Sequence, residues 1–118
     1  MGKLNKVESL IGLAQKAGKI ASGEFSAEKA IQSFRAELVI VAENASDNTK
    51  KHFRDMCDFR EIPFITYDDR DRLAQAIGKD VRVVLAVMDA GFAKAIQKAL
   101  QDMNQDNSEV GNGETKNC

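Results

Sequence analysis

The 118-residue sequence has no tryptophan, one proline, one tyrosine, one histidine and only two cysteines. A disulfide framework or a zinc site needs clustered cysteine and histidine, so the composition predicts neither a metal nor a cofactor. No apolar run approaches the roughly 20 residues that a helix needs to cross a bilayer. Residues 1–6 are too polar for a signal peptide. We therefore expect a cytoplasmic protein without membrane contacts.

The sequence also lacks an excess of either charge. It contains 17 Lys and Arg residues and 18 Asp and Glu residues, which gives a net charge of -1. This balance excludes a protein that bulk positive charge holds to nucleic acid, so any such contact must come from a local patch. Residues 1–35 carry six cationic and three anionic side chains, whereas residues 101–118 are acidic and poor in apolar side chains. We expect residues 1–100 to form one domain and residues 101–118 to be a disordered polar tail.

Helical and strand periods alternate along the first 100 residues. Apolar positions with helical spacing occur in residues 7–14, 27–34, 53–57, 73–77 and 92–99. Strands are predicted in residues 19–21, 38–42, 63–67 and 81–88. Gly18 is expected to end the first helix, and Ser22 and Ser46 to cap the second and third. Strands that are apolar on both faces need helices on both sides, so the sequence predicts an α/β fold, a three-layer α/β/α sandwich with a mixed, mostly four-stranded sheet.

The sequence offers little support for an enzyme. The single histidine, His52, has no partner in a catalytic motif, and we expect it at the surface. Cys57 follows Met56 on an apolar helical face and is expected to be a buried thiol. Asp68 and Asp69 follow a strand and could hold Mg²⁺, but capping of the next helix explains them better. We predict neither a catalytic residue nor a metal ligand.

A more informative segment lies at residues 16–24 (KAGKIASGE), where two lysines and two glycines precede a helix. Unpaired amides at a helix N-terminus attract phosphate, and Gly23 lets another backbone come close. Lys16 and Lys19, with Lys29 from the helix that follows, are expected to form a single basic ledge beside this turn. The alternative interpretation is structural, with a glycine that ends one helix, a serine that caps the next, and solvated lysines.

Four segments resemble a known family: residues 13–23 (LAQKAGKIASG), 29–31 (KAI), 38–46 (LVIVAENAS) and 78–82 (GKDVR). Together they are similar to the ribosomal L7Ae and L30e superfamily of kink-turn RNA-binding proteins, and to its small bacterial YlxQ-like branch. The resemblance spans residues 5–100. It implies an α/β/α sandwich that binds structured RNA, often in a ribosomal context.

The family's signature at the second helix is Gly-Thr-Asn-Glu-x-x-Lys, and residues 23–29 here are GEFSAEK. The resemblance implies that Gly23 approaches the RNA backbone and that Lys29 contacts a phosphate or a base edge. Glu24 can partly replace the lost contacts, because a carboxylate accepts hydrogen bonds from guanine. Phe25 and Ser26 depart from the signature, and the Phe25 ring cannot form a hydrogen bond. We expect Phe25 to pack against a neighbouring helix, with stacking on an unpaired base as the alternative.

Two further loops match the family in part. Glu43 and Asn44 match the acidic pair of its strand-to-helix loop. Where the family has an apolar residue, an acid and a valine, this chain has Lys79, Asp80 and Val81, and Arg82 follows. The complete set of expected RNA contacts is Lys16, Lys19, Gly23, Glu24, Lys29, Glu43, Asn44, Lys79, Val81 and Arg82.

The sequence therefore predicts a monomeric RNA-binding protein, not an enzyme, whose partner is structured RNA such as ribosomal RNA and not DNA. The departures at Phe25, Ser26 and Lys79 predict weakened or altered recognition of a standard kink-turn. One alternative is a protein-interaction module that has kept the fold and lost affinity for RNA. Another alternative is a small ligand-binding or catalytic α/β domain, which only His52 and the Asp68-Asp69 pair support.

Overall fold

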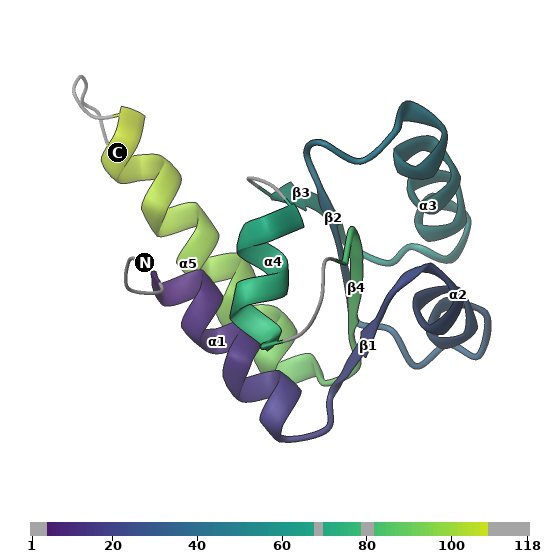
Figure 1. Ribbon diagram of the computed structural model, residues 1–118, viewed down its shortest axis with the longest axis horizontal. Helices are drawn as coiled ribbons and strands as arrows, with labels where there is room; N and C mark the ends of the chain where they lie inside the picture. Colours follow the sequence, from purple (N-terminus) through teal and green to yellow (C-terminus); the bar gives the residue numbers. More distant parts are fainter. Residues whose placement is uncertain (1–4, 68–69, 79–81, 109–118) are drawn as a thin grey trace.

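The computed structural model of the chain describes residues 5–67, 70–78 and 82–108 (Figure 1). These residues form helices and strands that alternate along the chain. In order they are α1 (Lys6–Lys16), β1 (Ile20–Ser22), α2 (Glu24–Gln32), β2 (Leu38–Ala42), α3 (Asp47–Arg60), β3 (Phe64–Tyr67), α4 (Arg70–Ile77), β4 (Val84–Val87) and α5 (Ala90–Ser108).

The four strands form one mixed sheet in the order β1-β4-β2-β3. Strand β4 is antiparallel to both β1 and β2, and β3 is parallel to β2. Strands β1, β2 and β3 therefore point in one direction and β4 in the other. The chain leaves β1, β2 and β3, and enters β4, at the same end of the sheet.

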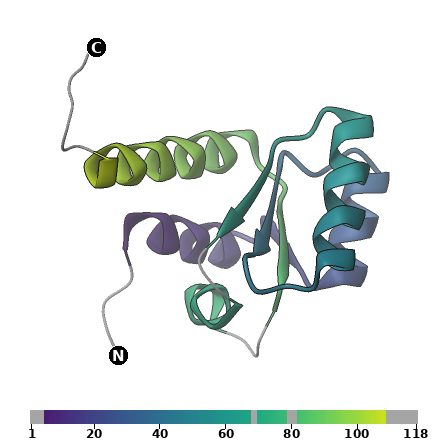
Figure 2. The ribbon, with the colours of Figure 1, turned by 90° about the horizontal axis from the view of Figure 1, so that it is seen from above.

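Helices cover both faces of this sheet, as the apolar strands predicted. All five residues of β2 are buried. Leu38 and Ile40 pack with apolar side chains of α1, α4 and α5, whereas Val39 and Val41 pack with those of α2 and α3. Figure 2 shows the two helical layers on opposite sides of the strands. The predicted three-layer α/β/α sandwich is thus confirmed.

The ends of α1 show how local sequence sets an element. Asn5 caps the helix by accepting a hydrogen bond from the Glu8 amide, and the Glu8 side chain accepts one from the Asn5 amide in return. Gly18 follows the helix with φ +74°, the left-handed conformation that glycine adopts without strain. Ser46 caps α3 as predicted, since its side chain accepts a hydrogen bond from the Thr49 amide.

Several predicted boundaries differ from the structure. Ser22 is not the cap of α2, because it pairs with Leu85 as the last residue of β1, and Gly23 takes the cap position instead. β4 starts at Val84, later than the predicted strand. Helix α5 continues past residue 100 to Ser108, and Met103 packs against the α1/α4/α5 core. No helix in the described parts of the chain is long and apolar enough to span a bilayer.

A buried carboxylate ties α1 to β3 and α4. Glu8 has no exposed surface. Its oxygens accept hydrogen bonds from the Tyr67 hydroxyl at 2.8 Å and from the Arg72 Nε and Nη2 atoms at 2.8 and 2.7 Å. The Asn5 amide side chain also donates to the Tyr67 hydroxyl, at 2.7 Å. The charge of Glu8 is thus paired and hydrogen-bonded, which is the condition for keeping a carboxylate inside a core.

Helices α1 and α4 approach closely at Gly12. A Cβ atom on Gly12 would lie 2.9 Å from the carbonyl oxygen of Ala76. We expect Gly12→Ala to lower the free energy of unfolding by about 1–3 kcal/mol, because the backbones must separate. Intrinsic helix propensity predicts the opposite sign, by about 1 kcal/mol in favour of alanine. Chemical denaturation measures the difference.

Ser9→Ala is the matched control, because Ser9 is an exposed residue of the same helix. In Ser9→Ala, the higher helix propensity of alanine should raise the free energy of unfolding by a few tenths of a kcal/mol, without a steric penalty. If Gly12→Ala proved as stable as the native chain, the close approach of α1 and α4 would not constrain this position.

Candidate nucleic-acid interface

Three chain segments meet at the end of the sheet where β1, β2 and β3 finish. The Gly23 amide donates to the Val84 carbonyl at 2.8 Å, and the Ala42 amide donates to the Val83 carbonyl at 2.8 Å. These bonds hold the start of α2 and the β2–α3 loop on either side of the chain that enters β4. Five of the predicted contact residues belong to these segments, and we call them the loop edge: Gly23, Glu24, Glu43, Asn44 and Arg82.

The start of α2 is open to an approaching anion. Gly23 has φ +94°, and the helix begins without a hydrogen bond from a capping side chain. Its first amides therefore have no side-chain acceptor, and they carry the positive end of the helix dipole. The Arg82 side chain lies beside Gly23, with its Cδ atom 3.7 Å from where a Cβ would stand. A guanidinium and free amides thus lie together at this end of the sheet.

The β2–α3 loop presents polar groups beside them. Glu43 and Asn44 are exposed. The Glu43 carboxylate accepts a hydrogen bond from the Thr66 hydroxyl of β3, and the Glu43 carbonyl accepts one from the Lys50 ammonium at 2.9 Å. The bond from Thr66 fixes one carboxylate oxygen of Glu43 and leaves the other able to accept from a base edge.

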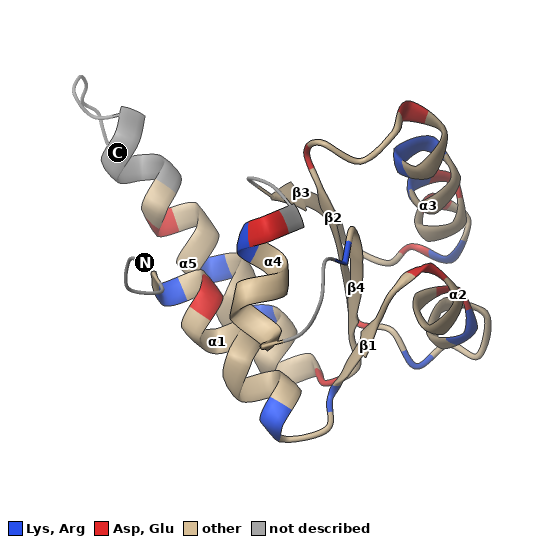
Figure 3. Cartoon of the chain, viewed as in Figure 1, with Lys and Arg blue, Asp and Glu red and all other residues tan. Residues whose placement is uncertain are grey.

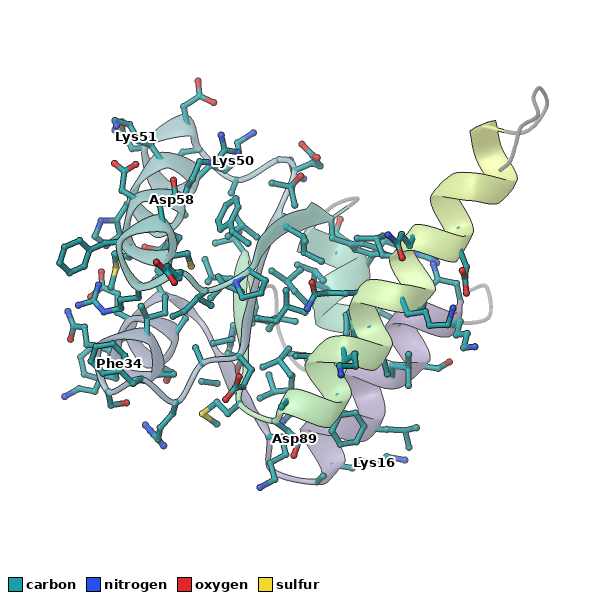
Figure 4. The ribbon with its side chains drawn as sticks, turned by 180° about the vertical axis from the view of Figure 1, so that it is seen from behind. Lys16, Phe34, Lys50, Lys51, Asp58 and Asp89 are labelled. Carbon is teal, nitrogen blue, oxygen red and sulfur yellow. The ribbon has the colours of Figure 1, made fainter. Side chains whose placement is uncertain are left out.

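Lys16 and Lys19 lie at the other end of the sheet. The Lys19 carbonyl accepts a hydrogen bond from the Met88 amide at 2.8 Å, just beyond the end of β4. Gly23 follows Lys19 by four steps of extended chain, which is about 13 Å. Figure 3 shows the blue positions at the end of α1 and before β1 far from the one at the start of β4. Figure 4 shows Lys16 and Asp89 together at that end, opposite Lys50.

The expected single ledge is therefore divided. Extended β1 carries Lys19 away from Gly23, a consequence that residue spacing alone does not reveal. Lys29 lies between the two ends, six residues after Gly23 and so about 9 Å along α2. Lys79 and Val81 lie outside the described residues, as do Asp68 and Asp69.

The expectation for Phe25 is wrong, because this ring does not pack against a helix. It is 73% exposed at the second residue of α2, and the Lys29 ammonium lies over it at 5.3 Å from the ring centre. The ring points to solvent because the apolar stripe of α2 is formed by Ala27, Ala30 and Ile31, on the opposite side of the helix.

Sequence reasoning missed two cations next to the loop edge. Lys50 and Arg54 line an open depression together with Glu43 and Thr66. Arg54 also lies over the Phe64 ring, at 5.2 Å from its centre. Their spacing of four residues in α3, directly after the matched Glu43-Asn44 pair, is the signal that could have indicated them.

His52 and Cys57 both have structural roles. His52 is at the surface, as predicted, and its Nε2 atom lies 2.5 Å from the Glu28 carboxylate of α2. Cys57 is buried in the α2/α3 core, and burial raises the pKa of its thiol to about 11. Such a thiol is protonated at neutral pH and a poor nucleophile. Within the described part of the chain, no three His, Cys, Asp or Glu residues are grouped as a metal site would need.

Similar architectures occur among solved structures. A protein described as of unknown function from Bacillus halodurans C superimposes with a TM-score of 0.79 and 38% identity, covering 81% of this chain and 97% of its own. A Giardia lamblia 15.5kD RNA binding protein gives a TM-score of 0.69 at 19% identity, covering 83% of this chain and 84% of its own. At that low identity, the second likeness concerns the fold alone.

Sequence comparison finds two relatives that share one name. RNA-binding protein YlxQ of Bacillus subtilis (strain 168) is 44% identical over 87 residues, which is 74% of this chain and 87% of the relative. RNA-binding protein YlxQ of Enterococcus faecium is 37% identical over 100 residues, or 85% and 96%. The model of the ribosomal protein L7Ae/L30e/S12e/Gadd45 family matches residues 5–97, nearly all of the described fold. The chain belongs to the ribosomal protein L7Ae/L30e/S12e/Gadd45 family.

Proposed function

We propose that this protein binds structured, kink-turn-like RNA at the loop edge. The observation that carries the proposal is the convergence at one end of the sheet of Gly23, the exposed Glu43-Asn44 pair and Arg82. The names of the two YlxQ relatives support RNA as the ligand. The net charge of -1 requires such a local site, because the chain as a whole does not attract a polyanion.

Each residue of the loop edge has a role suited to its chemistry. Arg82 and the first amides of α2 bind phosphate, and Gly23 leaves space for the RNA backbone. Glu24 and the free oxygen of Glu43 accept hydrogen bonds from guanine edges, and Asn44 can both donate and accept. Phosphate contacts position the RNA, and the base-edge contacts supply its specificity. Lys50 and Arg54 extend the cationic surface on the α3 side.

The set of side chains predicts altered recognition relative to a standard kink-turn. Phe25 and Ser26 replace polar residues of the signature, and Lys79 replaces an apolar residue. We propose ribosomal RNA as the source of the ligand, in the cytoplasm of a bacterial cell, with the protein acting as a monomer. Nanomolar binding of a standard kink-turn that neither Lys29→Ala nor Lys79→Ala weakens would contradict the altered specificity.

A protein-interaction module is the second candidate. Phe34 and Phe59 are 73% and 83% exposed, and the Arg60 guanidinium lies 5.8 and 5.4 Å from their ring centres. Figure 4 shows Phe34 on the outside of the α2/α3 layer. Exposed aromatic and arginine side chains are common where proteins bind each other. This surface is separate from the loop edge, so variants of each distinguish the two functions.

Salt-dependent RNA titration tests the proposal directly. Removing one phosphate contact should make the slope of log K against log salt shallower by about 0.7–0.9. We expect Arg82→Ala to show this change and a roughly tenfold loss of affinity for a kink-turn RNA, equivalent to about 1.4 kcal/mol. Glu43→Gln should instead reduce the preference for the kink-turn over a plain duplex while leaving the slope unchanged.

Lys94→Ala is the control, since Lys94 is an exposed cation of α5 on the other helical layer. Its affinity and salt slope should equal those of the native chain. Equal losses in Arg82→Ala and Lys94→Ala would indicate unspecific charge attraction. A native chain that binds the kink-turn no better than a duplex would overturn the proposal.

A further inference from the structure

The outer face of α2 carries an aromatic ring and cations that are not part of the loop edge. Phe25 and Lys29 are one turn apart, and the ammonium group covers one face of the ring at 5.3 Å. Since Phe25 is 73% exposed, the rest of the ring is open to solvent. Exposing the apolar ring surface to water is unfavourable in the free protein. An exposed ring beside a cation is typical of a surface on which another flat group stacks.

The surface continues from Lys29 along the helix. An open depression is lined by Lys29, Gln32, Ser33 and Arg35. The Ser33 hydroxyl accepts a hydrogen bond from Arg35 Nε at 3.0 Å and donates to the Lys29 carbonyl at 2.7 Å. These bonds fix the base of the guanidinium and leave its two terminal nitrogens to bind an anion. Phe25, Lys29 and Arg35, which we call the α2 track, thus follow one another away from Gly23.

We infer that the α2 track binds a single-stranded RNA segment that leaves the structured part at the loop edge. A base stacks on the open face of Phe25, and the next phosphates contact Lys29 and Arg35. Alternation of a stacking ring with cations is how proteins hold single strands without reading their sequence. The inference rests on the proposed function, since the loop edge supplies the point from which the strand starts.

Neighbouring acidic groups define the course of the strand. Glu28 is turned toward α3, where it contacts His52, so its charge does not face the track. Arg35 also lines the next depression, which contains Glu37 as well as Lys19. A carboxylate there disfavours another phosphate, so we expect the contact to end at Arg35. RNA fits this alternation better than an apolar protein segment, because one cation, Lys29, accompanies the ring and a second, Arg35, lies ten residues after Phe25.

The test compares a kink-turn RNA with blunt ends and the same RNA with a short oligouridine extension, placed at either end in turn. With the native chain, one of the two extensions should tighten binding roughly tenfold, the effect of one stacked base. Phe25→Leu should remove most of this gain and leave the blunt RNA bound as before, whereas Phe25→Tyr should retain it. Arg35→Ala should make the salt slope shallower by about 0.7 for the extended RNA only.

Phe59→Ala is the matched control, because Phe59 is also an exposed phenylalanine beside a cation, on α3. It should keep the full gain from the extension. Equal affinity for blunt and extended RNA overturns the α2 track and leaves the loop edge intact. Equal weakening of both RNAs by Phe25→Leu also overturns it, since the ring would then act within the structured site. Failure to bind either RNA would instead overturn the proposed function itself.

Discussion

Replacing Arg72 by alanine is expected to lower the free energy of unfolding by about 3–5 kcal/mol, the effect of leaving a buried charge without its partner. Arg72 gives the Glu8 carboxylate two hydrogen bonds, at 2.8 and 2.7 Å. Glu8 has no exposed surface through which water could replace them, whereas the Arg72 side chain is 34% exposed. For a domain of about 100 residues this loss lowers the melting temperature by roughly 15 °C or more.

The difference in exposure also predicts an order among the variants. Glu8→Leu leaves a guanidinium that can reach solvent, so it should destabilise the protein less than Arg72→Ala does. The double variant with Glu8→Leu and Arg72→Met should recover most of the stability, because well-packed apolar residues often replace a buried ion pair without loss. Thermal and chemical denaturation of the native chain, the two single variants and the double variant give the coupling energy.

The Lys51–Asp55 pair supplies the control. Its ammonium and carboxylate are 3.0 Å apart, but both side chains are largely exposed. Lys51→Ala should therefore change stability by no more than about 0.5 kcal/mol. If Arg72→Ala were equally mild, the Glu8 network would not stabilise the junction of α1, β3 and α4.

The layers of this fold were predictable because the central strands, β2 and β4, carry their own evidence of burial. Leu38–Ala42 is apolar at every position, which requires helices on both faces, and the structure has them. The cap of α2 was not predictable in the same way. Ser22 is a good capping residue, but its pairing with Leu85 keeps it in β1. Gly23 therefore occupies the N-cap position of α2. Tertiary pairing decided between two locally acceptable choices.

The candidate site was predictable in part for a related reason. Gly23, Glu43 and Arg82 are distant in sequence, and only the resemblance to a family linked them before strand directions were known. Lys19 is close to Gly23 in sequence, yet β1 places it at the other end of the sheet. Proximity along a chain indicates proximity in space for helices and turns, but an extended strand separates its ends by its full length.

The Glu8 network could not be predicted from the sequence. Its acceptor lies 59 residues from Tyr67 and 64 residues from Arg72. The local signal is only the Asn5-x-x-Glu8 spacing of a capping box, which places the carboxylate at the start of α1. Nothing in that spacing indicates burial, because most capping carboxylates are solvated.

Alkaline pH is expected to destabilise the protein by up to about 5 kcal/mol. Burial, with a smaller contribution from the neighbouring charge of Asp58, raises the pKa of Cys57 from its ordinary value of 9.0 to about 11. Burial likewise raises the pKa of Tyr67 from 10.0 to about 12; the hydrogen bond from Asn5 acts in the opposite direction, and the hydrogen bond to Glu8 in the same direction. In both groups, the native state therefore keeps a proton that the unfolded chain releases.

The sign follows from proton linkage. Well below pH 9, the lower of the two ordinary pKa values, both groups are protonated in both states, and the stability is complete. As pH rises from about 9 to 12 the unfolded chain binds fewer protons than the native state, so the free energy of unfolding falls. Each unit of pKa difference contributes about 1.4 kcal/mol, and two groups shifted by about two units each account for the total.

Denaturant titrations at a series of pH values measure this loss. Cys57→Ala should make the decline between about pH 9 and 11 shallower by removing one of the two groups. Because the chain has one tyrosine and no tryptophan, the tyrosinate absorbance reports Tyr67 alone. That band should develop near pH 12 in the folded protein and near pH 10 once it is unfolded. Ionisation of the folded protein near pH 10 would show that the Tyr67 hydroxyl is not shielded by Glu8 and the surrounding core.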